Sequence, residues 1–223
     1  MRTSGSPEPQ TRAKRRTRAL SNHLPRGAGS LTGRPLCHGV EMSLVLITGI
    51  QAAGKSTVAQ ALAERLPRSV HVRGDAFRRM IVNGRAEMGP ANPSHEAVQQ
   101  LHLRYALAAE AADGYAEAGF DVILQDIILG PDLAWVVERL LTRPLHVVVL
   151  TPDPGVVEAR DRERQRSGKV AYRPGDQGIV ALDAALRAET PHLGLWLDTS
   201  ELTVEESVNT ILEQLETEAH VSP

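Results

Sequence analysis

The feature that most constrains the fold of this chain is the glycine-rich turn at residues 49–56. It reads Gly49-Ile50-Gln51-Ala52-Ala53-Gly54-Lys55-Ser56 and fits the pattern G-x-x-x-x-G-K-[ST] at every fixed position. The run before it, residues 44–48, is short and almost wholly apolar, and apolar side chains recur after it at Val58, Leu62 and Leu66. The first pattern predicts a strand covered on both faces, and the second predicts an amphipathic helix.

A turn of this kind binds polyphosphate through its main chain. Successive N–H groups point inward, the helix N-terminus adds partial positive charge, and the glycines let the backbone approach the phosphates. We therefore expect residues 49–57, with Thr57 as the last, to bind a nucleoside triphosphate. Lys55, one of only three lysines in the chain, is expected to reach the β and γ phosphates, and the Ser56 hydroxyl is expected to hold Mg²⁺. ATP is favoured because the chain has no Asn-Lys-x-Asp motif for reading guanine.

Strand-like and helix-like segments alternate after the turn. The predicted strands are residues 44–48, 69–73, 120–126, 145–150 and 193–197, and the predicted helices begin near residues 55, 75, 94, 131, 154, 177 and 203. This alternation predicts an α/β fold with a parallel sheet between two layers of helices.

The first 41 residues have a different composition. They carry a formal charge of +6, whereas the remaining residues carry −8, and they contain four prolines and no sustained apolar period. We expect residues 1–41 to be a disordered basic tail, residues 42–217 to form the folded domain, and residues 218–223 to be a C-terminal tail. The basic tail could be an arm for anionic partners or a transit peptide, or Met42 could be the true start.

Composition excludes several classes of protein. No apolar run approaches the roughly 20 residues that cross a bilayer, so no membrane partner is expected. The single cysteine, Cys37, excludes an internal disulfide framework and a multi-cysteine zinc site. Aromatic residues make up 3% of the chain and the net charge is −2, which disfavours a nucleic-acid partner. A cytoplasmic location is expected.

Two carboxylates follow predicted strands, where ligands of an open α/β sheet bind. Asp75, after the second strand, is expected to orient a hydroxyl group or accept its proton, with Arg78 on the same side clamping substrate or phosphate. The alternative is that Asp75 caps the following helix. Asp126, after the third strand, is expected near Mg²⁺ or the substrate, although many strands end in aspartate.

Arginines on the helix after the fourth strand have two interpretations. Arg160 and Arg164 share one helical face, and like charges at this spacing repel unless water or an anion separates them. They could form a short lid that stabilises the transferring phosphoryl group, helped by Gly168 and Gly175 beyond it. The alternative is a solvated face of salt bridges with Asp161 and Glu163.

Taken together, these motifs resemble those of the small P-loop kinases that include chloramphenicol phosphotransferase-like proteins, with polynucleotide 5′-kinase as a more distant relative. The resemblance spans roughly residues 43–217 and includes the strand end Leu195-Trp196-Leu197-Asp198-Thr199-Ser200. It implies a three-layer P-loop NTPase fold with strand order 2-3-1-4-5. It also implies ATP- and Mg²⁺-dependent transfer of the γ-phosphoryl group to a hydroxyl, with Asp75 as the base or as the residue that orients the hydroxyl. Together with the patterns above, the expected catalytic residues are Lys55, Asp75, Arg160 and Arg164, and Arg78 and Asp126 are expected at the substrate.

Three functions are compatible with the motifs. The favoured one is a kinase for a small hydroxylated molecule such as an antibiotic, a sugar or a nucleoside-like compound. The alternatives are a polynucleotide 5′-hydroxyl kinase, which the −8 charge of the domain disfavours, and a non-catalytic ATP-binding regulator. We expect residues 80–105 and 127–135 to select the acceptor.

Overall fold

The computed structural model of the chain describes residues 43–88, 93–166 and 178–222. All of these belong to one unit that begins at Pro35. The predicted disordered tail, residues 1–41, lies outside the described residues, and so do Gly168 and Gly175 of the predicted lid.

Five parallel strands form one sheet in the order β2-β3-β1-β4-β5, which confirms the predicted fold class and strand order. The strands are β1 (Leu44–Gly49), β2 (Ser69–Arg73), β3 (Asp121–Gln125), β4 (Leu145–Leu150) and β5 (Leu195–Leu197). Every residue of β1 and β4 is buried. This burial explains why both strands read as continuous apolar runs rather than alternating ones.

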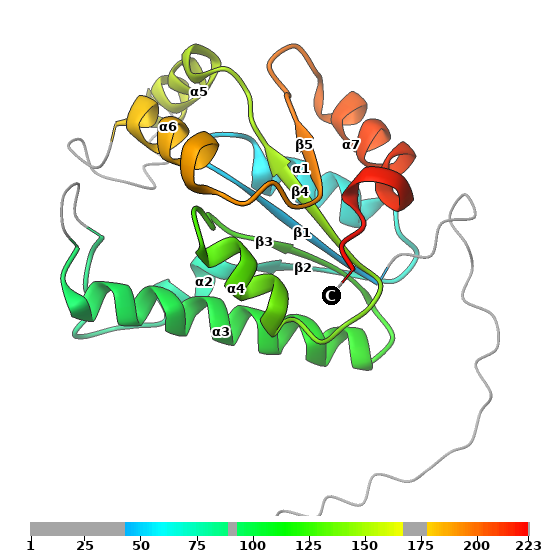
Figure 1. Cartoon of the computed structure of the whole chain (residues 1–223), viewed down its shortest axis with the longest axis horizontal. Helices are drawn as coiled ribbons and strands as arrows, with labels where there is room; N and C mark the ends of the chain where they lie inside the picture. Colours follow the sequence, from blue (N-terminus) through cyan, green and yellow to red (C-terminus); the bar gives the residue numbers. More distant parts are fainter. Residues whose placement is uncertain (1–42, 89–92, 167–177, 223) are drawn as a thin grey trace, which may run out of the picture. The chain divides into compact units, whose positions relative to one another are not determined.

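Helices cover both faces of the sheet. Figure 1 shows α3 and α4 on one side of the strands and α1 and α7 on the other. The helices are α1 (Lys55–Glu64), α2 (Gly74–Arg79), α3 (His95–Glu117), α4 (Asp132–Arg139), α5 (Pro154–Arg166), α6 (Ile179–Glu189), α7 (Val204–Glu213) and the π-helix η1 (Leu215–Ala219). Among the described residues, no helix combines the length and the apolar character that a membrane crossing needs.

Side-chain caps set the start of two helices. The Ser94 hydroxyl accepts a hydrogen bond from the Ala97 N–H at 3.1 Å, which places the start of α3 where the sequence predicted it. At α7 the Thr203 hydroxyl accepts from the Glu206 N–H, and the Glu206 carboxylate accepts from the Thr203 N–H. This reciprocal pair is a capping box, and it satisfies two amides that the helix itself leaves without partners.

The C-terminal residues continue the fold where the sequence predicted a tail from residue 218. Leu215 and Ala219 are fully buried, and the Val221 N–H donates to the Leu145 carbonyl at 2.9 Å. His220 forms an antiparallel bridge with His146 of β4. The segment has few apolar residues, so the sequence did not predict that it packs on the fold. In the structure these residues are buried beside the beginning of β4.

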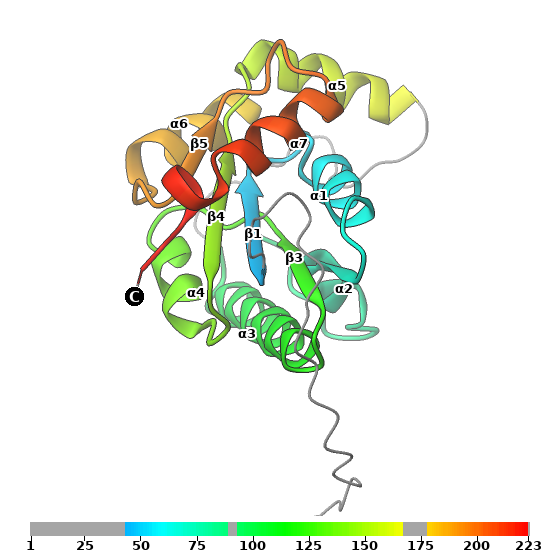
Figure 2. The same cartoon turned by 90° about the vertical axis from the view of Figure 1, so that its right-hand side faces the viewer.

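The parallel arrangement places the carboxyl ends of all five strands at one edge of the sheet. In Figure 2 the arrowhead of β1 points toward the end of the sheet beside which α5 lies. The glycine-rich turn, the start of α2 and the residues after β3 therefore meet at this edge, where open α/β sheets bind their ligands.

Substitution of two glycines with left-handed backbone conformation can measure how tightly the chain is packed beside β5. Gly194 (φ 67°) precedes β5, and a Cβ there would overlap the Val147 carbonyl oxygen, whereas Gly119 (φ 83°) has open space. We expect Gly119→Ala to lower the free energy of unfolding by about 1 kcal/mol through backbone strain alone. Gly194→Ala should lower it by about 3 kcal/mol, because steric overlap adds to the strain. Urea denaturation of both variants measures the difference, and equal losses would contradict the packing at β5.

Candidate active site

The glycine-rich turn has the backbone conformation of a phosphate cradle. Gly49 (φ 141°), Ala52 (φ 57°) and Gly54 (φ 96°) all have positive φ. Alanine rarely adopts this conformation, so Ala52 stores strain that a functional loop can use. Helix α1 begins at Lys55 after Gly54, and because a glycine precedes the helix, no side chain caps its first amides. These amides and the helix dipole are available to an anion.

The turn forms one wall of a cavity of about 990 Å³. Residues from five other parts of the chain complete the wall. They are Arg73, Asp75, Arg78, Arg79 and Arg85; Arg104; Gln125, Asp126 and Ile127; Arg160 and Arg164; and Thr199, Leu202, Val204 and Ser207. The structure therefore brings together the side chains to which the sequence assigned a catalytic, substrate or metal role.

Lys55 is buried at the base of the cavity. Its Nζ donates to the Ile50 carbonyl at 2.6 Å, so the side chain curls back over the turn. Burial lowers the pKa of Lys55 to about 7, and the charges of Arg164 and Arg104 add to this effect while Asp126 opposes it. A bound triphosphate would favour the protonated form, because an opposite charge nearby stabilises the ammonium group.

Ser56 contacts a residue that the sequence reasoning did not select. Its hydroxyl donates to Gln125 Oε1 at 3.3 Å, and the parallel register pairs Gln125 with Ile47 near the end of β1. The predicted metal ligand, the Ser56 hydroxyl, thus lies beside a second neutral oxygen, the amide oxygen of Gln125. Mg²⁺ accepts such neutral oxygens together with water and phosphate oxygens. Gln125 could be recognised only from the strand pairing, which places it opposite Ile47 near the end of β1.

Asp126 is committed to a buried ion pair. Its two carboxylate oxygens accept from Arg104 Nε and an Arg104 terminal nitrogen at 2.9 and 2.6 Å, and Oδ1 also accepts from the Ile127 N–H at 2.8 Å. Burial raises the pKa of Asp126, while Arg104 and the Ile127 N–H pull it down. The role of Asp126 at Mg²⁺ or the substrate stays a prediction. Both of its oxygens already accept hydrogen bonds from Arg104, whereas the Gln125 amide oxygen lies beside Ser56.

Arg104 also lines the cavity and was not predicted from the sequence. It lies on α3 within the apolar face formed by Leu101, Tyr105 and Ala108, and only 7% of its side chain is exposed. An arginine among apolar neighbours at helical spacing is a signal for a buried partner. The pair also explains Gly74, where a Cβ would overlap the Asp126 carboxylate.

Asp75 lies in the first turn of α2 and lines the cavity. Arg73 is the residue that precedes this helix, so Asp75 is not its N-cap. Asp75 forms ion pairs with Arg79 and with Arg73, whose Nε lies 3.6 Å from Asp75 Oδ1. Within the described residues, Asp75 Oδ1 has no hydrogen-bond partner. Asp75 thus lines the same cavity as the phosphate-binding turn, and its role toward the acceptor hydroxyl stays a prediction.

Arg160 and Arg164 reach the cavity from α5. Arg160 donates to the Thr199 carbonyl at 3.1 Å, and Arg164 donates to Asp161 Oδ1 at 2.6 Å. Arg166 pairs with Glu163 on the exposed side of the helix. Helix α5 thus contains both features that the sequence left open, a salt-bridged outer face and two arginines directed to the cavity. Their action as a lid stays a prediction.

A second cavity of about 260 Å³ adjoins the first. Gln51, Arg78, Arg104 and Ile127 line both cavities. Much of the remaining wall is apolar and comes from Met88, Pro93, Ala97, Leu101, Tyr105, Leu129 and Leu182. Most of these residues fall in the two segments, 80–105 and 127–135, that were expected to select the acceptor.

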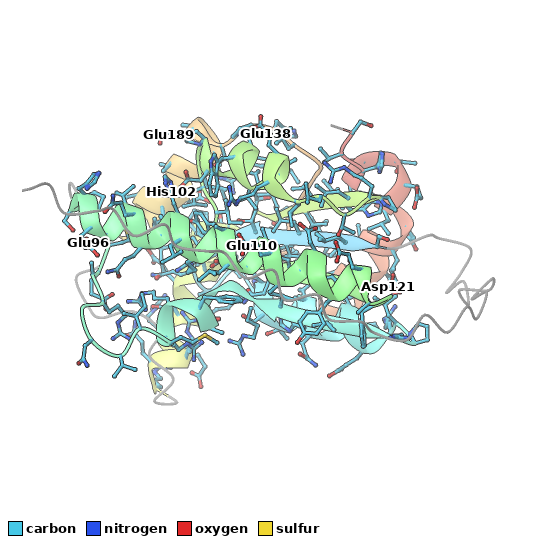
Figure 3. The ribbon with its side chains drawn as sticks, turned by 90° about the horizontal axis from the view of Figure 1, so that it is seen from below. Glu96, His102, Glu110, Asp121, Glu138 and Glu189 are labelled. Atoms are coloured by element: carbon cyan, nitrogen blue, oxygen red, sulfur yellow. The ribbon has the colours of Figure 1, made fainter. Side chains whose placement is uncertain are left out.

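A histidine positions one polar group of this second cavity. His102, which is labelled on α3 in Figure 3, has its Nε2 3.0 Å from Asp132 Oδ1. Its ring stacks on Trp135 at a centroid distance of 5.3 Å. Trp135 therefore packs against the histidine, and Asp132 lies at the cavity wall on α4.

Comparison with known proteins places this arrangement in a family. The model of the AAA domain family AAA_33 matches residues 44–188. An adenylyl-sulfate kinase of Phocaeicola vulgatus is 29% identical over 172 residues, which cover 76% of this chain and 80% of that protein.

Solved structures share the fold at lower identity. A sugar kinase from Janibacter sp. is 20% identical with a TM-score of 0.57, covering 79% of this chain and 95% of that one. The APS kinase of Mycobacterium tuberculosis, solved with AMPPNP and APS, is 19% identical with a TM-score of 0.57, covering 79% and 98%.

The lowered pKa of Lys55 predicts proton uptake on nucleotide binding. At about pH 8 Lys55 is mostly neutral in the free protein and should gain a proton when a triphosphate raises its pKa. ATP affinity should therefore fall as the pH rises above about 7. Calorimetry in two buffers of different ionisation enthalpy measures the uptake. Lys55→Arg, which stays charged, should abolish it. Equal uptake in both proteins would assign the proton to another group.

The buried ion pair should contribute strongly to stability. Arg104→Met leaves Asp126 buried without its cation and should lower the free energy of unfolding by about 3–5 kcal/mol. The loss should shrink as the pH falls, because the buried carboxyl can then take up a proton. The double variant Arg104→Met/Asp126→Asn should regain part of the lost free energy of unfolding, because it no longer buries an unpaired charge. Arg166→Met, at an exposed pair, is the control and should change stability by less than about 0.5 kcal/mol. Similar losses at both arginines in urea denaturation would contradict the assignment.

Proposed function

The chain belongs to the AAA_33 family of AAA domains, and on that premise we propose that it is an ATP-dependent kinase for a small hydroxylated molecule. Three features support this proposal. The phosphate cradle, a second carboxylate and two arginines from α5 line one cavity, and an apolar cavity adjoins it. The curated relative of 29% identity is an adenylyl-sulfate kinase, so phosphoryl transfer to a small molecule occurs on a related sequence.

The observation that carries the proposal is a second carboxylate in the cavity of the phosphate cradle. Asp75 lines the same cavity as Lys55 and Ser56, and its Oδ1 accepts no hydrogen bond from the described residues, although Arg73 Nε lies 3.6 Å away. A hydroxyl acceptor must lose a proton during transfer, whereas a phosphate or carboxylate acceptor is already ionised at neutral pH. A carboxylate in the wall of the same cavity as the phosphate cradle can accept that proton, so its presence favours an alcohol as acceptor.

The proposed reaction is a single displacement. A bond forms between the acceptor oxygen and the γ-phosphorus of ATP, and the bond from that phosphorus to the β–γ bridging oxygen breaks. The electron pair of the broken bond stays on ADP, and the hydroxyl proton passes to the Asp75 carboxylate. The products are ADP and the phosphorylated acceptor, and water later receives the proton from Asp75.

The other cavity residues then have electrostatic roles. Lys55, Arg160 and Arg164 carry the charges that would stabilise the transferring phosphoryl group. Ser56 and Gln125 present the neutral oxygens that fit Mg²⁺ beside phosphate and water ligands. When bound, Mg²⁺ neutralises part of the phosphate charge.

Asp75→Asn tests this assignment. The variant should lose about 10²–10⁴-fold in turnover, because the amide cannot accept the hydroxyl proton. The affinity for Mg·ATP should stay within about threefold, since Asp75 is not part of the phosphate cradle. The measurement is a screen of hydroxylated compounds that scores ATP consumption and the mass gain of the acceptor, followed by calorimetry with Mg·AMPPNP.

Asp121→Asn is the matched control. Asp121 begins β3, at the end of the strand opposite Asp126, and should leave turnover unchanged. Full turnover in Asp75→Asn would remove Asp75 from the mechanism. Tight ATP binding by the wild type with no acceptor phosphorylated would favour the nucleotide-binding regulator.

A further inference from the structure

Four arginines gather on the acceptor side of the cavity. Arg73, Arg78, Arg79 and Arg85, here called the arginine quartet, come from the end of β2, from α2 and from the loop after α2. All four line the same cavity as the phosphate cradle, and none of them belongs to the cradle. Only Arg78 was assigned a role from the sequence, at the substrate or phosphate. The other three need a separate explanation.

The arginine quartet has too few carboxylate partners to be neutral. Arg73 and Arg79 share Asp75, with Arg73 Nε 3.6 Å from Asp75 Oδ1. Arg78 and Arg85 share Glu87, with Arg85 Nε 3.1 Å from Glu87 Oε1. Four guanidinium groups thus share two carboxylates. Since arginine stays charged and each guanidinium offers five N–H donors, a surplus of charge and of hydrogen-bond donors remains.

The nucleotide alone does not account for this surplus. Seven arginines and Lys55 line the cavity, against four carboxylates: Asp75 and Asp126 in the wall, and Glu87 and Asp161, which pair with cavity arginines. Lys55, Arg160 and Arg164 lie on the cradle and on α5, where the triphosphate is expected. A triphosphate bound with Mg²⁺ cancels only part of the positive charge, because the metal itself is a cation. The arginine quartet therefore fits a second anion.

From these contacts, and resting on the proposed kinase function, we propose that the acceptor is a small hydroxylated oxyanion. Its phosphate, sulfate or carboxylate group binds the arginine quartet, because guanidinium forks match the two oxygens of such groups. Asp75, between Arg73 and Arg79, then lies beside the hydroxyl of the same molecule.

The adjoining cavity limits the rest of the acceptor. Its volume of about 260 Å³ lies at or below the range usual for small-molecule sites. Arg78 lines both cavities, so an anion on the arginine quartet and a carbon skeleton in the second cavity can belong to one compact molecule. A nucleic-acid strand or a large glycosylated antibiotic would have to extend beyond this cavity.

The first test uses inorganic sulfate as the probe. Saturating Mg·AMPPNP occupies the phosphate cradle, and sulfate is then titrated by calorimetry. We expect saturable sulfate binding in the wild type and at least about tenfold weaker binding in Arg85→Gln, since a hydrogen bond to a charged group contributes about 1.5–3 kcal/mol. Arg162→Gln, an equal charge change on α5 outside the cavity wall, should bind like the wild type. Absent binding, or equal binding in all three proteins, would overturn the inference.

The second test uses acceptors with and without an anionic group. They are glycerol and glycerol 3-phosphate, glucose and gluconate, and a nucleoside with its 5′-monophosphate and its 5′-phosphosulfate, with a 5′-hydroxyl oligonucleotide as the polymeric comparison. We expect at least about tenfold higher kcat/KM for an anionic member, and Arg85→Gln should raise its KM while leaving the KM of ATP unchanged.

The two tests separate this inference from the proposed function. Faster phosphoryl transfer to the neutral acceptors would contradict the proposal of an anionic acceptor but would still support the kinase function. Transfer only to a 5′-hydroxyl oligonucleotide would overturn the small acceptor. If no compound gains mass, the kinase proposal fails, and the sulfate titration decides whether the arginine quartet is an anion site.

Discussion

The structure depends on the burial of β1 at the centre of the sheet. All six residues of β1 are buried, and its backbone pairs with β3 on one side and β4 on the other. A strand held on both edges cannot shift without breaking both ladders, so the point at which the chain leaves the sheet is well defined. The phosphate cradle begins at that point. Its strained Ala52 and its left-handed glycines can then hold a shape that an isolated loop would not keep.

The charge of the molecule is distributed very unevenly. The chain from residue 42 onward carries a formal charge of −8, yet seven arginines line one cavity. Net charge is therefore a poor guide to the partner here, because a concave site focuses the field of the charges that surround it. The acidic remainder of the domain would repel extended polyanions, while the cavity attracts compact ones. This contrast favours small anionic ligands over nucleic acid.

Much of the fold was predictable from the sequence because its signals are local. The limits of β2, the cap at Ser94 and the cradle at residues 49–56 all depend on neighbours within a few positions. The site was only partly predictable. Asp126 was predicted as a metal or substrate ligand because it follows an apolar strand, and that role stays a prediction. Its buried ion pair with Arg104, 22 residues earlier on another element, could not be predicted from the sequence. Gln125 was missed because only the register with β1 places it beside Ser56.

The sequence by itself determined the α/β class, the strand order through its resemblance to small P-loop kinases, and the chemistry of the phosphate cradle. Main-chain amides, a lysine and a hydroxyl act there within one contiguous turn, so their spacing along the chain is already their geometry. Only the tertiary structure decided which charges meet across the cavity. The Arg104–Asp126 pair, the arginine quartet and the burial of Val221 against β4 all join residues far apart in the chain or on different elements. Coulombic attraction and burial depend on distance in space, and folding alone establishes that distance.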